Sequence, residues 1–378
     1  MARPPVTITL PSQSLGTSRT LSVYRFGSED ARPKVYVQGG LHADEAAGPL
    51  TAHHLTVLLE EAEARGDIVG DITVVPVANP VGLSQTLLTD HLGRFDLASG
   101  RNYNRAFPDV SGAVLEAVEG RLGDDAHANR ATVAEEIKTA LADLDKTGDA
   151  DALQNTLLSM ACDADIVLDL HTDSEAEMHL YLDPEHWPGA SDLAGELDAK
   201  VVMFAKASGG NPFEETAAAP WHAVRGRHGA KAVPLPLTTV IELRGYTDAF
   251  DELAAKDAAA LYRFLQRRGA VAGDAGPPPN LSCVAAPFEA TGIVASPVAG
   301  VVAFKQDLGA EVSEGDLIAE IVDVSSNDDK TCRTPIYANT SGRLFTRCLI
   351  KIVRPGTTLA KIQGTEPMPS RTGYLLPD

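Results

Sequence analysis

One stretch decides the fold: Val35-Tyr36-Val37-Gln38-Gly39-Gly40-Leu41-His42-Ala43-Asp44-Glu45. An apolar run stops at two glycines, and a histidine and a glutamate follow three residues apart. Imidazole nitrogen and carboxylate oxygen are both common zinc ligands, and a catalytic zinc takes three protein ligands and a water. Because a lone His-x-x-Glu pair often occurs by chance, the rest of the chain must supply a third ligand.

Composition narrows the class of protein. A chain of 378 residues is long enough for two domains. The net charge of −20 argues against a nucleic-acid partner, which needs a basic surface. No run reaches the roughly 18 apolar residues of a membrane span, and the first residues lack an apolar signal core. The four cysteines fit no metal or disulfide spacing, so we expect free thiols in a soluble, cytoplasmic protein.

Apolar runs alternate with helical patterns in the first part of the chain. They predict strands at 6–25, 34–38, 71–79, 164–171, 178–182, 201–205 and 238–243, and helices at 49–65 and 248–268. This order favours an α/β fold with a mixed, mostly parallel sheet flanked by helices. We expect a long loop at 80–108, a helical surface excursion at 109–160 with two helices joined near Gly148, and an irregular segment at 207–233.

The sequence pattern of the chain changes after a glycine- and proline-rich linker at 269–279. We therefore expect a catalytic domain at 1–272 and a small all-β domain at 284–378. The segments 296–319 and 338–360 resemble the two halves of the barrel-sandwich fold of biotinyl and lipoyl carriers. Lys330 lies where carriers present a modified lysine, but the usual apolar flank is missing. A domain that packs beside the active site or makes an oligomer contact is therefore favoured over a carrier.

Two buried strands end at candidate metal ligands. His42 and Glu45 follow one strand, and His171 ends another. The crevice of an open parallel sheet lies at the carboxyl ends of its strands, so these side chains should meet. The pattern predicts one zinc ion held by His42, Glu45 and His171, with Asp44 as a supporting group. The alternative for His171 is a core histidine at a strand end.

Polar residues elsewhere in the chain are candidates for binding an anionic substrate and for acting as a general base. Arg94, Asn104 and Arg105 lie in one loop, and arginine binds carboxylates in a bidentate manner. The alternative is a solvated basic loop. Glu242 lies in a strand otherwise suited to burial, where an unpaired carboxylate is costly. It is a candidate for the base that takes a proton from water, unless it forms a salt bridge with Arg244 or another arginine.

Four motifs together resemble those of the succinylglutamate desuccinylase/aspartoacylase family, whose fold is zinc-carboxypeptidase-like. They are GLHADE at 40–45, NYNRAFP at 102–108, DLHT at 169–172 and VIEL at 240–243. The resemblance spans about residues 30 to 250, and the C-terminal β domain also fits. Tyr103 departs from the pattern, because many members carry an apolar residue there.

The resemblance implies a role for each matching position. The implied metal ligands are His42, Glu45 and His171, and Glu242 is the implied base. Arg94 would polarise the scissile carbonyl, while Asn104 and Arg105 would hold the substrate carboxylate. For substrate selection beyond the motifs, our candidates are Arg225, Trp221 and Arg244.

The resemblance implies a zinc-dependent amidohydrolase that removes an acetyl or succinyl group from an N-acyl amino acid by zinc-activated water. The substrate would be a small molecule, with no nucleic-acid or membrane partner, and a homo-oligomer is compatible with this function. A metallocarboxypeptidase acting on short peptides is the alternative. A carrier or binding module is a third hypothesis. An inactive scaffold is disfavoured because no expected ligand or base is missing.

Overall fold

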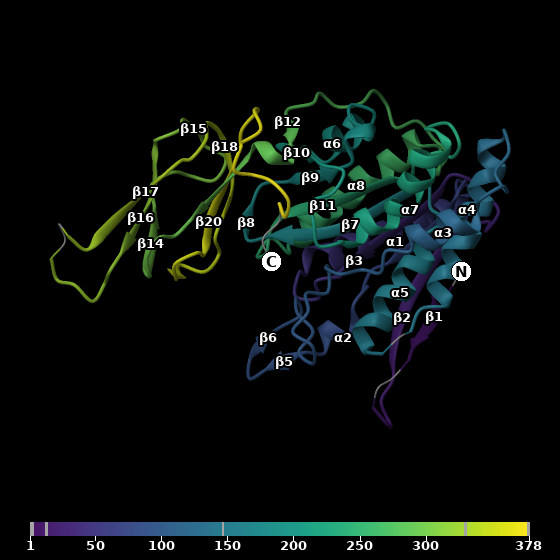
Figure 1. Ribbon diagram of the computed structural model, residues 1–378, viewed down its shortest axis with the longest axis horizontal. Coiled ribbons are helices and arrows are strands. Elements are labelled where there is room, and N and C mark those ends of the chain that lie inside the picture. Colours follow the sequence, from purple (N-terminus) through teal and green to yellow (C-terminus); the bar gives the residue numbers. More distant parts are fainter. Residues whose placement is uncertain (1–3, 12–13, 146, 329–330, 376–378) are drawn as a thin grey trace.

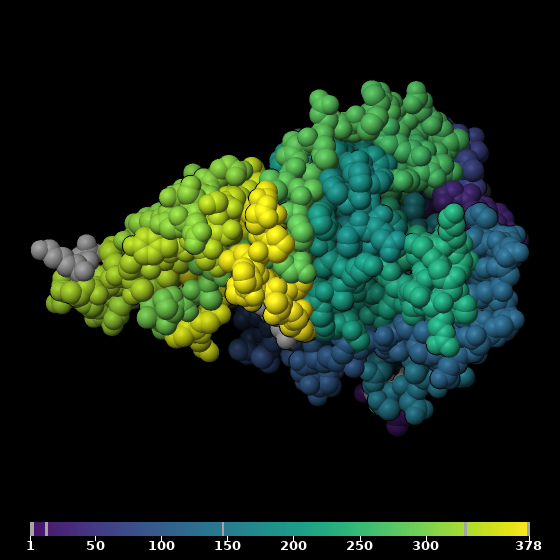
Figure 2. All heavy atoms as spheres, turned by 45° about the horizontal axis from the view of Figure 1, so that its top comes forward, coloured from purple at the N-terminus to yellow at the C-terminus, as the bar shows by residue number. Residues whose placement is uncertain are grey.

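The computed structural model describes residues 4–11, 14–145, 147–328 and 331–375. An α/β region and a C-terminal β domain lie beside one another (Figure 1). In Figure 2 the β domain, yellow-green to yellow, extends from one side of the α/β region. No helix within these ranges is long and apolar enough to cross a membrane.

The α/β region is built on a nine-stranded sheet of order β1-β2-β4-β3-β7-β11-β9-β10-β12. Strands β4, β3, β7 and β11 run parallel, whereas β9, β10 and β12 are parallel to one another and antiparallel to β11. The prediction of a mixed, mostly parallel sheet is confirmed. The strands are β1 (Val6–Leu10), β2 (Arg19–Gly27), β3 (Lys34–Gly39), β4 (Asp71–Val75), β7 (Ile166–Asp173), β9 (His179–Leu182), β10 (Val201–Phe204), β11 (Leu237–Gly245) and β12 (Val284–Pro287).

Helices cover both faces of this sheet, and alternate residues of each buried strand enter different cores. In β3, Val35 and Val37 join one core while Tyr36 joins the other. The first core includes α1 (Ala47–Arg65), α6 (Ser191–Glu196) and α8 (Asp251–Arg267). The second includes α3 (Ser111–Ala117), α4 (Ala126–Ala142), α5 (Asp149–Ala161) and α7 (Phe213–His228).

Two predictions about this region were wrong. Residues 109–160 form three helices, not two, and they are no surface excursion, since Val114, Ile137 and Leu153 are buried in the second core. Their acidic residues are exposed or half-buried. The segment at 207–233, expected to be irregular, contains α7 despite Pro220 inside it. Burial of Trp221 outweighs the low helix propensity of proline there.

The loop predicted at 80–108 is mostly irregular, as expected. It contains only short elements: α2 (Pro80–Leu83), β5 (Thr86–Leu87) and β6 (Asp90–His91). The loop crosses the carboxyl end of the central strands, because Gly93 lies against the backbone of Ala43 and Asp44. It is therefore part of the wall around the strand ends.

The C-terminal domain consists of two small sheets packed around an apolar core. Its strands are β13 (Thr291–Ala295), β14 (Gly300–Phe304), β15 (Glu311–Val312), β16 (Leu317–Val322), β17 (Arg333–Tyr337), β18 (Gly342–Arg347), β19 (Ile352–Val353) and β20 (Thr358–Gln363). The predicted all-β sandwich is confirmed. Lys330 lies outside the described residues.

The two regions exchange strands. β8 (Glu175–Ala176) follows β7 but pairs with β18 of the C-terminal domain. In return β12, which comes after the linker, pairs with β10 and completes the large sheet. The predicted start of the second domain at residue 284 therefore falls within the first sheet. This exchange holds the C-terminal domain against the carboxyl end of β7.

Candidate metal centre and active site

The turn after β3 is shaped by two glycines. Gly40 has a φ of +70°, a conformation that favours glycine. A Cβ on Gly39 would lie 2.6 Å from the backbone of Gly48, near the start of α1. The close packing of this turn against α1 places His42 and Glu45 over the end of the sheet.

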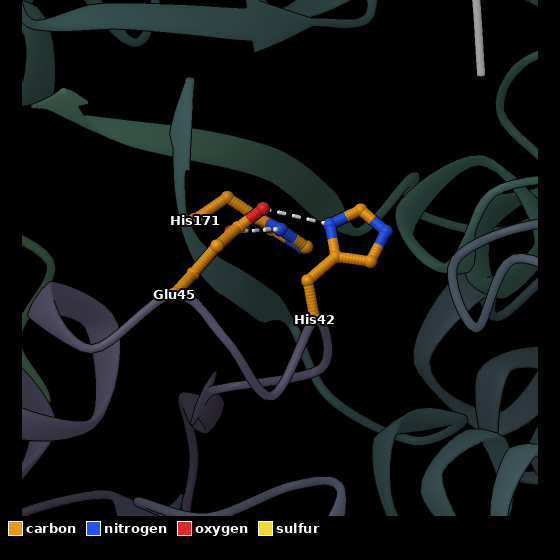
Figure 3. A group of neighbouring side chains, drawn as sticks. All are labelled: His42, Glu45 and His171. Carbon is orange, nitrogen blue, oxygen red and sulfur yellow. Dashed lines mark hydrogen bonds and ion pairs between the residues drawn. The ribbon is translucent and has the colours of Figure 1, made fainter. Parts of the chain in front are cut away.

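His42, Glu45 and His171 converge at that edge, and all three are buried. Figure 3 shows that the carboxylate of Glu45 is bonded to both imidazole rings, one dashed line leading to each. Glu45 Oε1 lies 2.9 Å from His42 Nδ1, and Glu45 Oε2 lies 3.0 Å from His171 Nδ1. The candidate ligand atoms are all within 4.8 Å of one another, as a tetrahedral site with bonds of about 2.0–2.2 Å requires.

Neighbouring residues orient both rings. Asn102 Oδ1 already accepts from the backbone N–H of Asn104 (2.9 Å), so the Nε2–H of His42 must be the donor to it (2.8 Å). The Nε2–H of His171 donates to Asp169 Oδ2 (2.9 Å), and Asp169 in turn accepts from Gln38 (2.9 Å). Both rings are thereby held with Nδ1 toward Glu45, the arrangement typical of metal-binding histidines.

The electrostatics of this group suit a cation. Burial and the nearby Arg94 lower the pKa of His42 to about 4, so its ring is neutral and its Nδ1 lone pair faces a carboxylate. Burial would also lower the pKa of His171, but Asp169 and Glu45 reverse this and raise it well above its usual value. Two imidazole nitrogens and one carboxylate form a nitrogen–oxygen–nitrogen donor set, which is one that zinc accepts in proteins.

Arg94, Asn104 and Arg105 lie around this group. Arg94 donates to Glu45 Oε1 (3.1 Å) and contacts His42 Nδ1 (3.1 Å), while part of its side chain stays exposed. The side-chain oxygen of Asn104 accepts from the backbone of Phe213 (2.8 Å), so it also holds the start of α7. Arg105 donates to the carbonyl of Asn104 (2.7 Å), which fixes its guanidinium at the cavity wall.

Glu242 lies on β11 directly beside His171 on β7. Its Oε2 is buried and has no hydrogen-bond partner among the described residues. Burial raises the pKa of Glu242 to about 8, with Glu45 adding to the shift and His171 opposing it. The alternative of a salt bridge with Arg244 is wrong, because Arg244 binds Asp257 of α8.

The three candidates for substrate selection lie elsewhere. Trp221 is fully buried in the second core, beneath the guanidinium of Arg130. Arg225 binds Glu185 (2.5 Å) and the carbonyls that follow α7. Arg244 is held by its partner on α8. None of the three lines the cavity around the metal group, so they are not candidates for contact with a substrate there.

A cavity of about 740 Å³ opens above these residues. The C-terminal domain forms one of its walls, with residues 346–350, 356–359 and Lys361. Lys361 of β20 binds Asp173 of β7 (2.5 Å), two residues after His171. Sequence reasoning missed the cavity residues Asp173, Tyr181, Glu214 and Lys361, and no motif in the sequence marked them.

Comparisons with known proteins agree with this architecture. A family model described as the succinylglutamate desuccinylase/aspartoacylase catalytic domain matches residues 31–266. No curated protein matches the chain.

Three solved structures are similar over nearly their whole length. A succinylglutamate desuccinylase/aspartoacylase family protein from Shewanella amazonensis SB2B is 27% identical, with a TM-score of 0.81 over 95% of this chain and 98% of that one. A protein of similar description from Shewanella frigidimarina NCIMB 400 is 24% identical, with a TM-score of 0.83 over 96% and 98%. The product-bound ectoine utilization protein EutE (DoeB) of Ruegeria pomeroyi is 18% identical, with a TM-score of 0.65 over 96% and 94%.

Proposed function

The chain belongs to the succinylglutamate desuccinylase/aspartoacylase family and is a hydrolase of small molecules, and from this premise we propose that it is a zinc-dependent amidohydrolase. It would remove an acetyl or succinyl group from an N-acyl amino acid. One observation carries the proposal: two oriented histidines and Glu45 converge beside Glu242, whose buried Oε2 has no partner among the described residues.

Each residue of the site has its own role in the proposed reaction. His42, Glu45 and His171 would hold one zinc ion, which supplies Lewis acidity and lowers the pKa of water. Glu242 takes the proton of the attacking water and then protonates the leaving amine. The exposed part of Arg94 donates to the oxygen on which negative charge develops. Arg105 binds the carboxylate of the amino acid and so fixes the angle of attack.

The cavity favours a small substrate over a peptide. Its volume of about 740 Å³ lies within the range of small-molecule sites, roughly 300–1,000 Å³. The wall from the C-terminal domain limits what extends beyond the scissile bond. The same wall supports the view that this domain packs beside the active site. Dipeptides assayed beside N-acyl amino acids would separate the deacylase from a metallocarboxypeptidase.

The proposal is tested by Glu242→Gln, which keeps the shape of the side chain and removes the base. We expect one zinc per chain to remain, while kcat falls by about 10²- to 10⁴-fold. The matched control is Glu252→Gln, the same change at an exposed position in the first turn of α8. Metal analysis and steady-state kinetics on both variants give the answer, and full activity in Glu242→Gln would overturn the assigned mechanism.

A further inference from the structure

The chain returns to the α/β region after β20, the last strand of the C-terminal domain. We call residues 368–375 the C-terminal segment, and Figure 2 shows the yellow end of the chain at the junction of the two regions. The backbone N–H of Met368 donates to the carbonyl of Glu289 (2.8 Å), and that of Leu375 to the carbonyl of Ser208 (2.7 Å). Leu375 is 2% exposed and packs among apolar residues of β10 and β18. The segment is therefore anchored at both of its ends.

This anchoring places Tyr374 beside Arg105. The Nε–H of Arg105 donates to the hydroxyl of Tyr374 (3.0 Å). The tyrosine ring lies against Gly209 and Gly210, where a Cβ would be 2.9 Å from ring Cδ2 and 2.5 Å from the hydroxyl, respectively. A Cβ on Gly210 would also lie 2.8 Å from Cδ of Arg105. The two glycines therefore leave the space in which the tyrosine and the arginine meet.

Arg105 is held by three parts of the chain at once. Its Nε is bonded to Tyr374 and its Nη1 to the carbonyl of Asn104 (2.7 Å), so bonds at two nitrogens fix the plane of the guanidinium. The backbone N–H of the next residue, Ala106, donates to the carbonyl of Gly210 (2.7 Å). A long arginine side chain loses much rotamer freedom when it binds a ligand. Holding it in place beforehand lowers that cost and keeps the ligand in one orientation.

We infer that Tyr374 is a positioning residue, which orients Arg105 for the substrate carboxylate and so makes the C-terminal segment part of the binding apparatus. This inference rests on the proposed function, in which Arg105 binds that carboxylate. Arg105 lines the cavity and Tyr374 does not, so the tyrosine acts through the arginine and not by contact with the substrate. Bidentate binding of a carboxylate depends on the plane of the guanidinium. Loss of the tyrosine hydroxyl should therefore weaken the binding of substrates that carry this carboxylate.

The first test is Tyr374→Phe on the zinc-loaded enzyme, with the best substrate from a panel of N-acetyl and N-succinyl amino acids. We expect kcat/KM to fall by about tenfold, mainly through a higher KM. The matched control is Tyr337→Phe, the same change at an exposed tyrosine of β17, and its kcat/KM should stay within about twofold of the wild-type value. Zinc content and melting temperature show that both variants are folded. Wild-type kinetics in Tyr374→Phe would overturn the inference and leave the proposed function standing.

The second test compares that substrate with its α-carboxamide, which has nearly the same shape and lacks the negative charge. The ratio of kcat/KM between acid and carboxamide should fall by about tenfold in Tyr374→Phe and stay unchanged in Tyr337→Phe. If the carboxamide is not turned over, its inhibition constant replaces KM in the comparison. A purely structural role of Tyr374 would reduce activity on both compounds equally, and that result would overturn the inference.

A measurement without turnover separates the inference from the proposed function. Phenylglyoxal modifies guanidinium groups, and mass mapping of peptides gives its rate of reaction at Arg105. Tyr374→Ala removes both the hydrogen bond and the ring, while Leu375 still anchors the segment. We expect Arg105 to react several-fold faster in this variant than in the wild type, and at the wild-type rate in Tyr337→Ala. If no member of the panel is hydrolysed, the proposed function fails, whereas an equal rate at Arg105 in Tyr374→Ala and the wild type would overturn the inference.

Discussion

Glutamates in two regions of the α/β fold differ in whether their carboxylates are paired. Under α8, Glu196 is bound by Arg263 and Arg267, both at 2.6 Å. At the carboxyl end of the sheet, Glu214 is buried and Glu242 is half-buried, yet each keeps a buried oxygen without a partner among the described residues. The first arrangement is that of a structural acid, whose charge is neutralised within the fold.

The difference shows which groups are kept available for chemistry. An unpaired buried carboxyl is costly to stability, and such costs concentrate at functional sites. Burial raises the pKa of Glu242 and of Glu214 to about 8, which brings their titration close to neutral pH. A base that gives up and regains a proton near neutral pH is suited to general acid–base catalysis. Removing the partner of a paired acid should therefore destabilise the fold, whereas removing an unpaired acid should stabilise it.

The largest effect should come from breaking a paired acid. Arg244→Met would leave Asp257 buried and uncompensated, because Arg244 is the partner that ties β11 to α8. We expect a loss of about 3–5 kcal/mol in the free energy of unfolding, measured by urea titration. KM should stay within about threefold of the wild-type value, since Arg244 does not line the cavity. A large rise in KM without loss of stability would restore Arg244 as a substrate contact.

Removing an unpaired acid should stabilise the metal-free protein. The pKa of Glu242 rises on folding from 4.5 to about 8, so the folded state disfavours the anion. The wild type therefore loses stability as the pH rises from 4.5 to 8, at about 1.4 kcal/mol per unit, and Glu242→Gln does not. Between pH 5 and 8 we expect the variant to gain on the order of 2–4 kcal/mol relative to the wild type. Denaturation of both proteins at pH 5 and at pH 8 measures this gain. If the difference in stability between variant and wild type were the same at both pH values, the raised pKa of Glu242 would be contradicted.

The strand ends could be predicted from the sequence because their signals are local. A β-branched run that stops at glycines and is followed by His42 and Glu45 predicts a strand end with candidate ligands from about ten residues. The same holds for Glu242, which stands out as a charge in an apolar strand. The resemblance of four short motifs joined these local signals into one site.

The rest depends on contacts that no local pattern encodes. Glu214 reads as an ordinary acid in the first turn of a helix, and Lys361 reads as a surface lysine of the β domain. Only the strand exchange between β8 and β18 brings Lys361 to Asp173. The prediction that Arg225 selects the substrate was wrong for a related reason. Arginine is suited to anion binding, but in this fold Arg225 binds Glu185 and backbone carbonyls.

A smaller effect should follow from disturbing the orientation of a ligand. Asn102→Ala removes the acceptor that holds the Nε2–H of His42, so the ring can adopt the other tautomer. Loss of such a partner costs about 10- to 100-fold in metal affinity. Competition with a chelator measures the change, and the matched control is Asn339→Ala, whose side chain donates to the carbonyl of Ile293 within the C-terminal domain. Equal zinc affinity in wild type and Asn102→Ala would show that this hydrogen bond does not set the ligand geometry.

The smallest effect links the β domain to the base. Lys361 lowers the pKa of Glu242, and Asp173, its ion-pair partner, raises it. Lys361→Met removes the lysine and uncovers the aspartate, so both changes move the pKa of Glu242 upward. The rising limb of kcat/KM should then shift to higher pH, by less than about one unit. Lys351→Met is the control, since Lys351 crosses the same domain contact to Glu175 but is not among the charges with the largest effect on the pKa of Glu242. A shift of the same size in both variants would mean that the β domain acts through packing alone and not through the charge of Lys361.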